Sequence, residues 1–178
     1  LGAYILVGLA FVPPTPFSIK DFERRDLAQP AGQPIQLFRS VVGSAHGVQE
    51  LADFRTYLNS HQSIEEELDR LDGLVQENPE ELIAVVHTPP KNTRCDVLST
   101  GQHIGSEAVR RWIERRQPLL TLHGHIHESP KMSKAFADRI GASRTVNPGC
   151  DKRAPHMVLI DLENVDEMTH SVYSQRKP

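Results

Sequence analysis

The chain has 178 residues, of which 38% are hydrophobic and 24% charged, and its formal net charge is -3. This length is sufficient for one domain with a substantial core and leaves little room for a second. The slightly acidic balance excludes the strongly basic surface that attracts nucleic acid. The two cysteines, Cys95 and Cys150, are far apart and form no CxxC pair, so we expect reduced thiols and a cytoplasmic protein.

The first twelve residues, LGAYILVGLAFV, are apolar and resemble the core of a signal peptide. They lack an initiating Met, a basic N-terminal region and a small-residue cleavage pattern, which argues against secretion. The stretch is also shorter than the roughly 18 residues that a membrane-spanning helix requires, and no longer apolar stretch follows. We therefore expect no membrane partner. Because the chain starts on Leu1 within a strand-like pattern, we also expect that another segment precedes it.

The N-terminal third is predicted to alternate short elements with a long loop. Residues 3–12 are rich in β-branched and aromatic side chains, which predicts a buried strand or a tight pair of short strands. Three prolines follow, and the polar, Pro-bearing sequence up to residue 35 predicts a long loop, a feature that is commonly functional. Residues 35–42 resemble a second short strand, and residues 49–60 resemble a short helix.

The middle of the chain has the pattern of a β-α-β unit. A capping box in SIEE begins a helix predicted over residues 63–77, with its apolar side chains on one face. The apolar run 82–87 predicts a buried strand, a second helix is predicted over 106–117, and residues 119–123 predict the next strand. Together these elements indicate a mixed α/β (α+β) domain. Strand-length apolar runs also occur in residues 144–149, 156–162 and 169–175.

Two histidines flank one residue in the segment Gly124-His125-Ile126-His127, directly after the predicted strand 119–123. An HxH pair in extended chain places two imidazoles on the same side, and neutral imidazole is a ligand for Zn, Fe and related divalent ions. Gly124 allows the backbone to turn at this point. Because a chain with nine histidines produces such a pair easily by chance, the HxH segment alone is weak evidence for a metal site.

His87 strengthens this hypothesis because it ends the other predicted buried strand and is followed by a rigid Thr-Pro-Pro segment. If the two strands are neighbours joined by the helix between them, a right-handed crossover brings their carboxyl ends side by side. His87 would then lie near His125 and His127. The competing interpretation is a polar strand-end residue that hydrogen-bonds to backbone, and it is favoured when the HxH segment is left out.

In the order and spacing of these motifs the chain resembles the calcineurin-like metallophosphoesterases. VVHTPP and LHGHIHESP are similar to the family's fourth and fifth blocks, a strand ending in His and a strand ending in GHxH. TVNPG resembles the NPG segment of many bacterial members, and FVPPTPFSIKDFER and CDVLSTGQHIGS resemble linking segments of one prokaryotic subgroup. The resemblance implies that residues 1–178 are the C-terminal portion of a single metallophosphoesterase domain, a partial β-sandwich flanked by helices.

For the site, the resemblance implies that His87 and His125 bind one metal ion and that His127 binds the other. The expected cofactors are two divalent ions, Mn, Zn, Fe or Ni, and the expected substrate is a phosphomonoester or phosphodiester. Two such ions lie roughly 3.5 to 4 Å apart, hold a bridging hydroxide and clamp the phosphate oxygens. The resemblance therefore predicts a hydrolase that acts on ester bonds.

The family's first three blocks, DxH, GDxxD and GNH(D/E), have no counterpart in residues 1–178. In the family these blocks supply the bridging Asp, further metal ligands and the His thought to protonate the leaving group. Three neutral histidines cannot offset the charge of two divalent ions. We therefore expect a weak one-metal site and an inactive chain, and the catalytic residues stay unassigned.

Asp96 and His103, in CDVLSTGQHIGS, are candidates for substrate contact, although a loop Asp more often forms a turn. His123 could orient a metal ligand, but a strand histidine bonded to backbone is the more common case. A second class of function also stays open, a shortened phosphoesterase-like domain that serves as a binding or scaffold module with relic histidines. The sequence does not define the oligomeric state, and a homo-oligomer is compatible with it.

Overall fold

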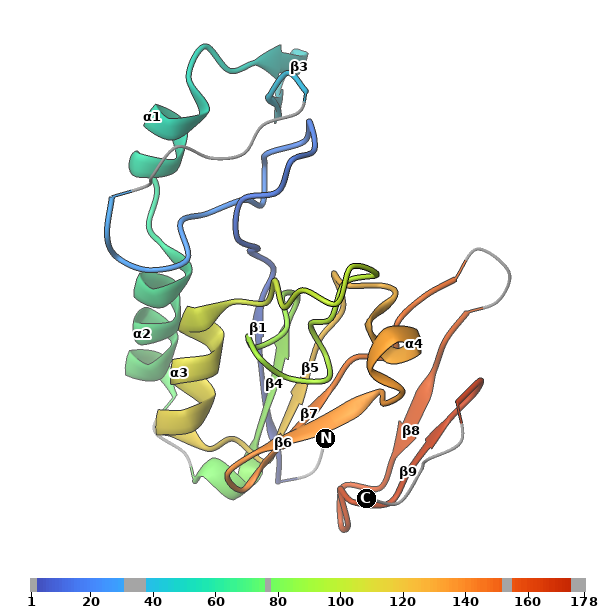
Figure 1. The fold of residues 1–178 in the computed structure, drawn as a ribbon. Coiled ribbons are helices and arrows are strands. Elements are labelled where there is room, and N and C mark those ends of the chain that lie inside the picture. Colours follow the sequence, from blue (N-terminus) through green and yellow to red (C-terminus); the bar gives the residue numbers. More distant parts are fainter. Residues whose placement is uncertain (1–2, 31–37, 76–77, 152–154, 174–178) are drawn as a thin grey trace.

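The computed structural model describes residues 3–30, 38–75, 78–151 and 155–173. Its centre is a five-stranded sheet in the order β1-β4-β5-β7-β6, in which β6 runs antiparallel to β7 and the other pairs are parallel (Figure 1). The expected mixed α/β (α+β) class is therefore confirmed. The strands of this sheet are β1 (Ile5–Leu9), β4 (Leu82–Val86), β5 (Leu120–Leu122), β6 (Ala137–Ile140) and β7 (Ser143–Val146).

Two helices cover one face of the sheet, α2 (Ile64–Leu74) and α3 (Glu107–Arg116). Their apolar side chains share one buried cluster with β1 and β4, as expected for an amphipathic helix on a sheet. Trp112 is buried and donates its ring N–H to Asp72, which ties α3 to α2 at 2.9 Å. The cluster contains Val7, Ile64, Leu68, Leu82, Ala84, Val86, Ala108, Val109, Trp112, Ile113 and Ile140.

The opposite face carries an antiparallel ladder of β8 (Val158–Ile160) and β9 (Met168–His170). Its side chains pack with those of the sheet in a second cluster, which includes Leu120, Val146 and Met168. The described residues place two strands on this face rather than a full second sheet, so the expected β-sandwich stays a prediction. A short helix, α4 (Ser129–Ser133), and a one-turn helix, η1 (Pro79–Glu81), complete the body.

An arm projects beyond the carboxyl ends of β1, β4 and β5 (Figure 1). We use this name for the loop 13–30 together with residues 38–60. The arm contains a hairpin of β2 (Val41–Ser44) and β3 (Gly47–Glu50), followed by α1 (Phe54–Asn59). The loop 13–30 contains no helix or strand, which confirms that part of the predicted loop.

Most predicted elements are present with shifted bounds. The β4-α3-β5 unit and α2 with its capping box are confirmed, although α2 ends at Leu74 instead of residue 77. The strand predicted over 35–42 begins at Val41, and its residues 35–37 lie outside the described part. β3 occupies the start of the helix predicted over 49–60, because Gly47 adopts a positive φ of 110° and closes a hairpin.

β1 differs from the buried strand predicted for residues 3–12. It pairs with β4 and lies at the edge of the sheet, and Leu6 is 53% exposed. The longest described helix has 11 residues, and none in the described ranges combines the length and apolar character needed to cross a membrane.

Candidate metal site at the carboxyl edge of the sheet

Parallel pairing of β4 and β5 brings the two histidine motifs together. The backbone N–H of Gly124 donates to the carbonyl oxygen of His87 at 3.0 Å, which extends the ladder beyond β5. His125 then adopts a left-handed conformation with a φ of 58°, so the chain bends as it leaves the sheet. A Cβ at Gly124 would lie 3.4 Å from Nδ1 of His87, about van der Waals distance, so this position is directly beside that imidazole.

The imidazoles of His87 and His125 lie edge to face, with their ring centroids 5.3 Å apart and an interplanar angle of 66°. His125 is partly buried, whereas His87 and His127 are exposed. The three side chains therefore occupy an open edge of the sheet. Within the described residues, no three His, Cys, Asp or Glu side chains form a group that could hold a metal ion, so these histidines are at most part of a ligand set.

The ring nitrogens of His87, His125 and His127 form no hydrogen bond with any described residue. Burial lowers the pKa of His125 to about 4, and the nearby His87 and His127 act in the same direction. Burial and then the neighbouring His127 also lower the pKa of His87. Both imidazoles are consequently neutral at neutral pH, with lone pairs available, which is the state that a metal ion requires.

His123 lies two residues before His125 and has the opposite surroundings. Its Nδ1–H points at the carbonyl oxygens of Val86 and Thr88 at 2.8 and 3.0 Å, and its Nε2 accepts from the Thr121 hydroxyl at 2.7 Å. Burial lowers its pKa to about 4. The prediction of a strand histidine bonded to backbone is therefore confirmed. These bonds span the ends of β4 and β5 and fix the positions from which His87 and His125 extend.

Asn147, after β7, holds the turn that carries the HxH segment. It is fully buried, and its side-chain amide donates to the carbonyl oxygens of Gly124 at 3.2 Å and Ile126 at 3.0 Å. The same amide donates to the carbonyl oxygen of Cys95 at 2.9 Å, and its oxygen accepts from the backbone N–H of Gly149. Asn147 therefore holds its own turn and positions the HxH turn as well.

Asp96 and His103 lie in the loop that follows β4. Asp96 is fully buried, and its two oxygens accept from the backbone N–H groups of Asn92, Thr93 and Gly105. The Nδ1–H of His103 donates to the same carboxylate at 2.6 Å, and the His103 side chain is 39% exposed. With its oxygens occupied, Asp96 is placed to orient His103 rather than to touch a ligand. The prediction that these residues bind substrate stays a prediction.

No known family profile matches the chain. It is 35% identical over 78 residues to MJ1162, an uncharacterized protein of Methanocaldococcus jannaschii, and this match covers 42% of the chain. The match spans about a third of that relative, 34% of its length. A solved crystal structure aligns with 61% of this chain and 38% of its own, at 19% identity and a TM-score of 0.46, and supports no argument about function.

Sequence reasoning missed the residues opposite the histidines. A hollow of about 450 Å³ extends from His87 and His125 to the loop 13–30 of the arm. The apolar side chains of Phe17 and Phe22 line it, and both are exposed. The available signal was the presence of large apolar residues in a Pro-rich segment that has no strand or helix periodicity.

Proposed function

We propose that this chain is the distal half of a metal-dependent phosphoesterase, a hydrolase of phosphomonoesters or phosphodiesters that needs two divalent ions. The observation that carries the proposal is the His87–His125 pair. These two neutral imidazoles come from adjacent strand ends, have ring centroids 5.3 Å apart, and form no hydrogen bond with the described residues. His87 is exposed and His125 is partly buried, so their ring nitrogens are accessible to a ligand.

His87 and His125 would hold one ion and His127 the other. Zn, Fe and Ni suit imidazole ligands, and Mn would depend more on the carboxylates of the acidic blocks. When bound, such ions supply Lewis acidity toward the phosphoryl oxygens and a hydroxide nucleophile. The chain itself contributes neutral nitrogen ligands on a fixed frame. His123 fixes the two strand ends and Asn147 fixes the HxH turn.

The histidines fit a single ion better than two, because the described part of the chain places no bridging carboxylate in a group with them. Asp96 does not fill this role, since four hydrogen bonds already occupy its oxygens. We therefore infer that this chain alone binds one ion weakly and does not hydrolyse phosphoesters. A cytoplasmic setting is part of the proposal and is supported by two unpaired cysteines, Cys95 and Cys150.

A second candidate function is a non-catalytic binding or scaffold module. The observation that favours it is that no three His, Cys, Asp or Glu side chains of the described residues form a metal-holding group. In that case the histidines would be relics without a catalytic role, and metal ions would not bind in a fixed ratio to the chain.

The test is the reading frame upstream of Leu1 and the activity of the protein that it encodes. We expect DxH, GDxxD and GNH to occur there in that order. The longer protein should hydrolyse bis(4-nitrophenyl) phosphate in the presence of Mn or Zn, and the 178-residue chain should not. Equal turnover by both forms would contradict the proposal, because the bridging ligand would then lie within this chain.

A further inference from the structure

The arm loop that faces the histidines is held by a buried ion pair. The Lys20 ammonium donates to both oxygens of Glu23 at 3.1 Å and to the carbonyl oxygen of Thr15 at 2.7 Å. Glu23 also accepts from the backbone N–H of Thr15 at 2.9 Å and from its hydroxyl at 2.5 Å. The same ammonium lies 4.4 Å from the ring centroid of Phe54 in α1. Because this buried pair makes all its hydrogen bonds, it fixes the loop in one conformation.

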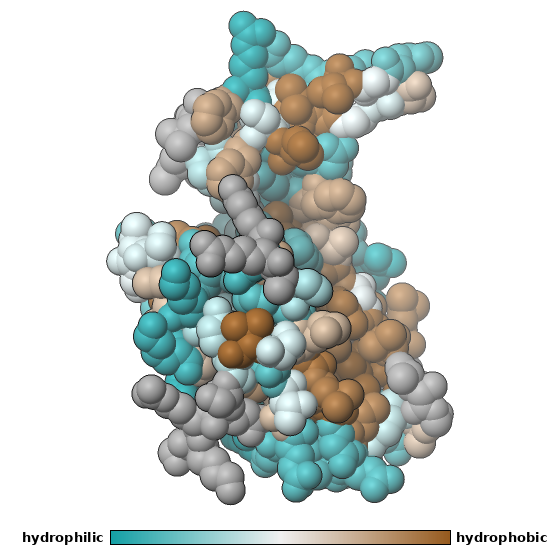
Figure 2. All heavy atoms as spheres, turned by 90° about the vertical axis from the view of Figure 1, so that its right-hand side faces the viewer, coloured by the Kyte–Doolittle hydropathy of each residue, from teal (hydrophilic) through white to brown (hydrophobic). Residues whose placement is uncertain are grey.

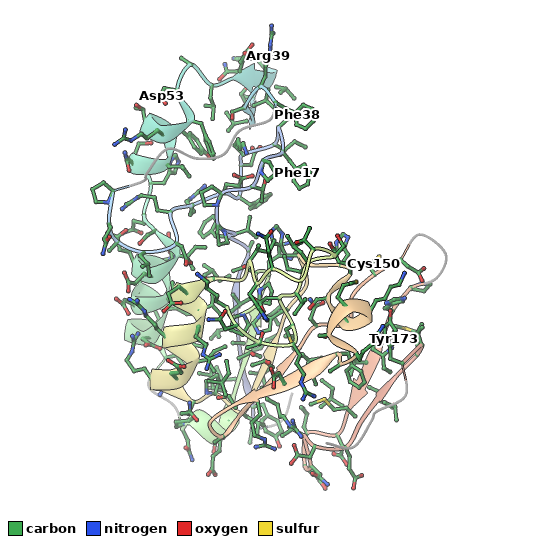
Figure 3. All side chains as sticks on the ribbon, in the orientation of Figure 1. Phe17, Phe38, Arg39, Asp53, Cys150 and Tyr173 are labelled. Atoms are coloured by element: carbon green, nitrogen blue, oxygen red, sulfur yellow. The ribbon has the colours of Figure 1, made fainter. Side chains whose placement is uncertain are left out.

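A hollow of about 450 Å³ separates this loop from the histidines, and we call it the apolar groove. Its volume is in the range of roughly 300 to 1,000 Å³ that is typical of small-molecule sites. Phe17, which lines the groove, lies on the side of the arm above the sheet edge (Figure 3). One end of the groove is polar, formed by His87 and His125, and the rest is apolar, formed by Ala10, Val12, Phe17, Ile19 and Phe22.

Three large apolar side chains that line the groove are mostly exposed. Phe17 is 64%, Ile19 70% and Phe22 58% exposed, and Figure 2 shows apolar side chains gathered on this face of the arm. Contiguous exposed apolar side chains commonly mark binding sites. The buried ion pair holds the loop in this conformation, in which these three side chains are exposed beside the histidines.

The polar atoms of the groove discriminate among ligands. Glu23 and Thr15 also line it, but they bond to each other and to Lys20. Among the described polar side chains that line the groove, only His87 and His125 keep unbonded polar atoms. A sugar or nucleobase would leave its own polar groups unpaired against the apolar wall, whereas an alkyl or aryl group would not.

We propose that the apolar groove binds the alcohol part of the phosphoester substrate and that this part is an apolar alkyl or aryl group. The inference rests on the proposed function, because His87 and His125 place the phosphoryl end. Phe17, Ile19 and Phe22 then cover the apolar end on the side of the arm. Specificity for the organic group would therefore reside in a segment far in sequence from the metal ligands.

The probes are ethyl-, butyl- and hexylphosphonic acid, titrated calorimetrically into the 178-residue chain with and without Zn. We expect the affinity to rise about two- to fourfold for each added methylene, since each buried methylene favours binding. Phe17→Ala and Phe22→Ala should flatten this dependence on chain length. Phe38→Ala is the matched control, because Phe38 is 58% exposed like Phe22 but does not line the groove.

The outcomes separate the groove from the metal site. Binding of Zn and of all three phosphonates with equal affinity would overturn the groove and leave the proposed function standing. A chain-length dependence that needs Phe17 but persists without any Zn binding would support the groove and overturn the proposed function. If Phe17→Ala abolishes self-association while the phosphonates show no chain-length dependence, the groove is an interface between two copies of the chain and the inference is wrong.

Discussion

Two pairs of histidine rings lie at nearly the same spacing in this molecule and differ in the hydrogen bonds that the rings form. The centroids are 5.3 Å apart for His87 and His125 and 5.4 Å apart for His156 and His170. The second pair lies beside the β8–β9 ladder, where both rings hydrogen-bond to the carbonyl oxygen of Pro148 and contact the ring of Tyr173. Tyr173 is labelled near this ladder in Figure 3. The first pair has no hydrogen bond to the described residues.

The comparison teaches that ring proximity does not identify a ligand site. His170 donates from Nε2 to Pro148 and accepts at Nδ1 from the backbone N–H groups of Val172 and Tyr173, so both of its nitrogens are committed to the fold. A metal ion would have to displace those bonds. At His87 and His125 a metal ion would not have to break a hydrogen bond to any described residue. The free energy of metal binding would therefore not be reduced by such a loss.

The largest difference between the two pairs should appear in catalysis. If the acidic blocks are encoded upstream as proposed, His125→Ala in that longer protein should lower kcat/KM for bis(4-nitrophenyl) phosphate by more than about a hundredfold. Loss of a residue that merely orients a metal ligand already costs roughly 10- to 100-fold. His170→Ala should change kcat/KM by less than about threefold, because the hydrogen bonds of His170 support the fold and their loss affects stability. Comparable losses in both variants would remove the distinction between the pairs.

The pH dependence of stability tests the neighbouring bonded histidine, His123. Its pKa is about 4 in the folded chain, against 6.5 for an ordinary histidine. Protonation therefore favours the unfolded state. The contribution of His123 is fully present above pH 6.5 and is lost as the pH falls toward 4, a loss of about 3 kcal/mol at about 1.4 kcal/mol per pH unit.

Urea unfolding at pH 7.5 and pH 4 measures this effect. His123→Gln should be less stable than the wild type at pH 7.5 and should lose less stability at pH 4. His46→Gln, a change at an exposed histidine in the β2–β3 turn, should keep the full pH dependence. An unchanged pH dependence in His123→Gln would show that other groups dominate the acid response.

A smaller difference, in the opposite direction, should appear in the free energy of unfolding when variants of the two pairs are compared at pH 7.5 without metal. His170→Ala should lower the free energy of unfolding by about 1 to 3 kcal/mol, because it leaves the carbonyl of Pro148 and two backbone N–H groups with fewer partners. His125→Ala should change it by less than about 0.5 kcal/mol, since no hydrogen bond is lost. A strongly destabilised His125→Ala would mean that this ring serves the fold.

The sequence predicted the frame of the site well because local signals define it. Capping residues and apolar periodicity placed β4, α3 and β5, and their order brought His87 beside the HxH segment. The interpretation of His123 as a backbone-bonded residue was also confirmed. These features depend on residues that are close in the sequence or on one crossover connection.

The features that the sequence could not predict depend mainly on contacts between residues far apart in the chain or on local backbone conformation. Asn147 reaches the HxH turn from 21 to 23 positions away, and nothing in NPG indicates which carbonyl oxygens its amide meets. The arm hairpin depended on a positive φ at Gly47, in a segment that also suits a helix. Phe17 and Phe22 line the same hollow as His87 and His125, in a loop that the Lys20–Glu23 pair helps to hold.

The most direct test of the metal site is a calorimetric titration of the 178-residue chain with Zn and Mn, with His46→Ala as the control for His87→Ala and His125→Ala. We expect one ion per chain with weak affinity in the wild type and in His46→Ala. Either site variant should abolish saturable binding, because it leaves the ion with only one of its two proposed imidazole ligands. Stoichiometric binding that persists in His87→Ala and His125→Ala, or no binding by the wild type, would contradict the assignment.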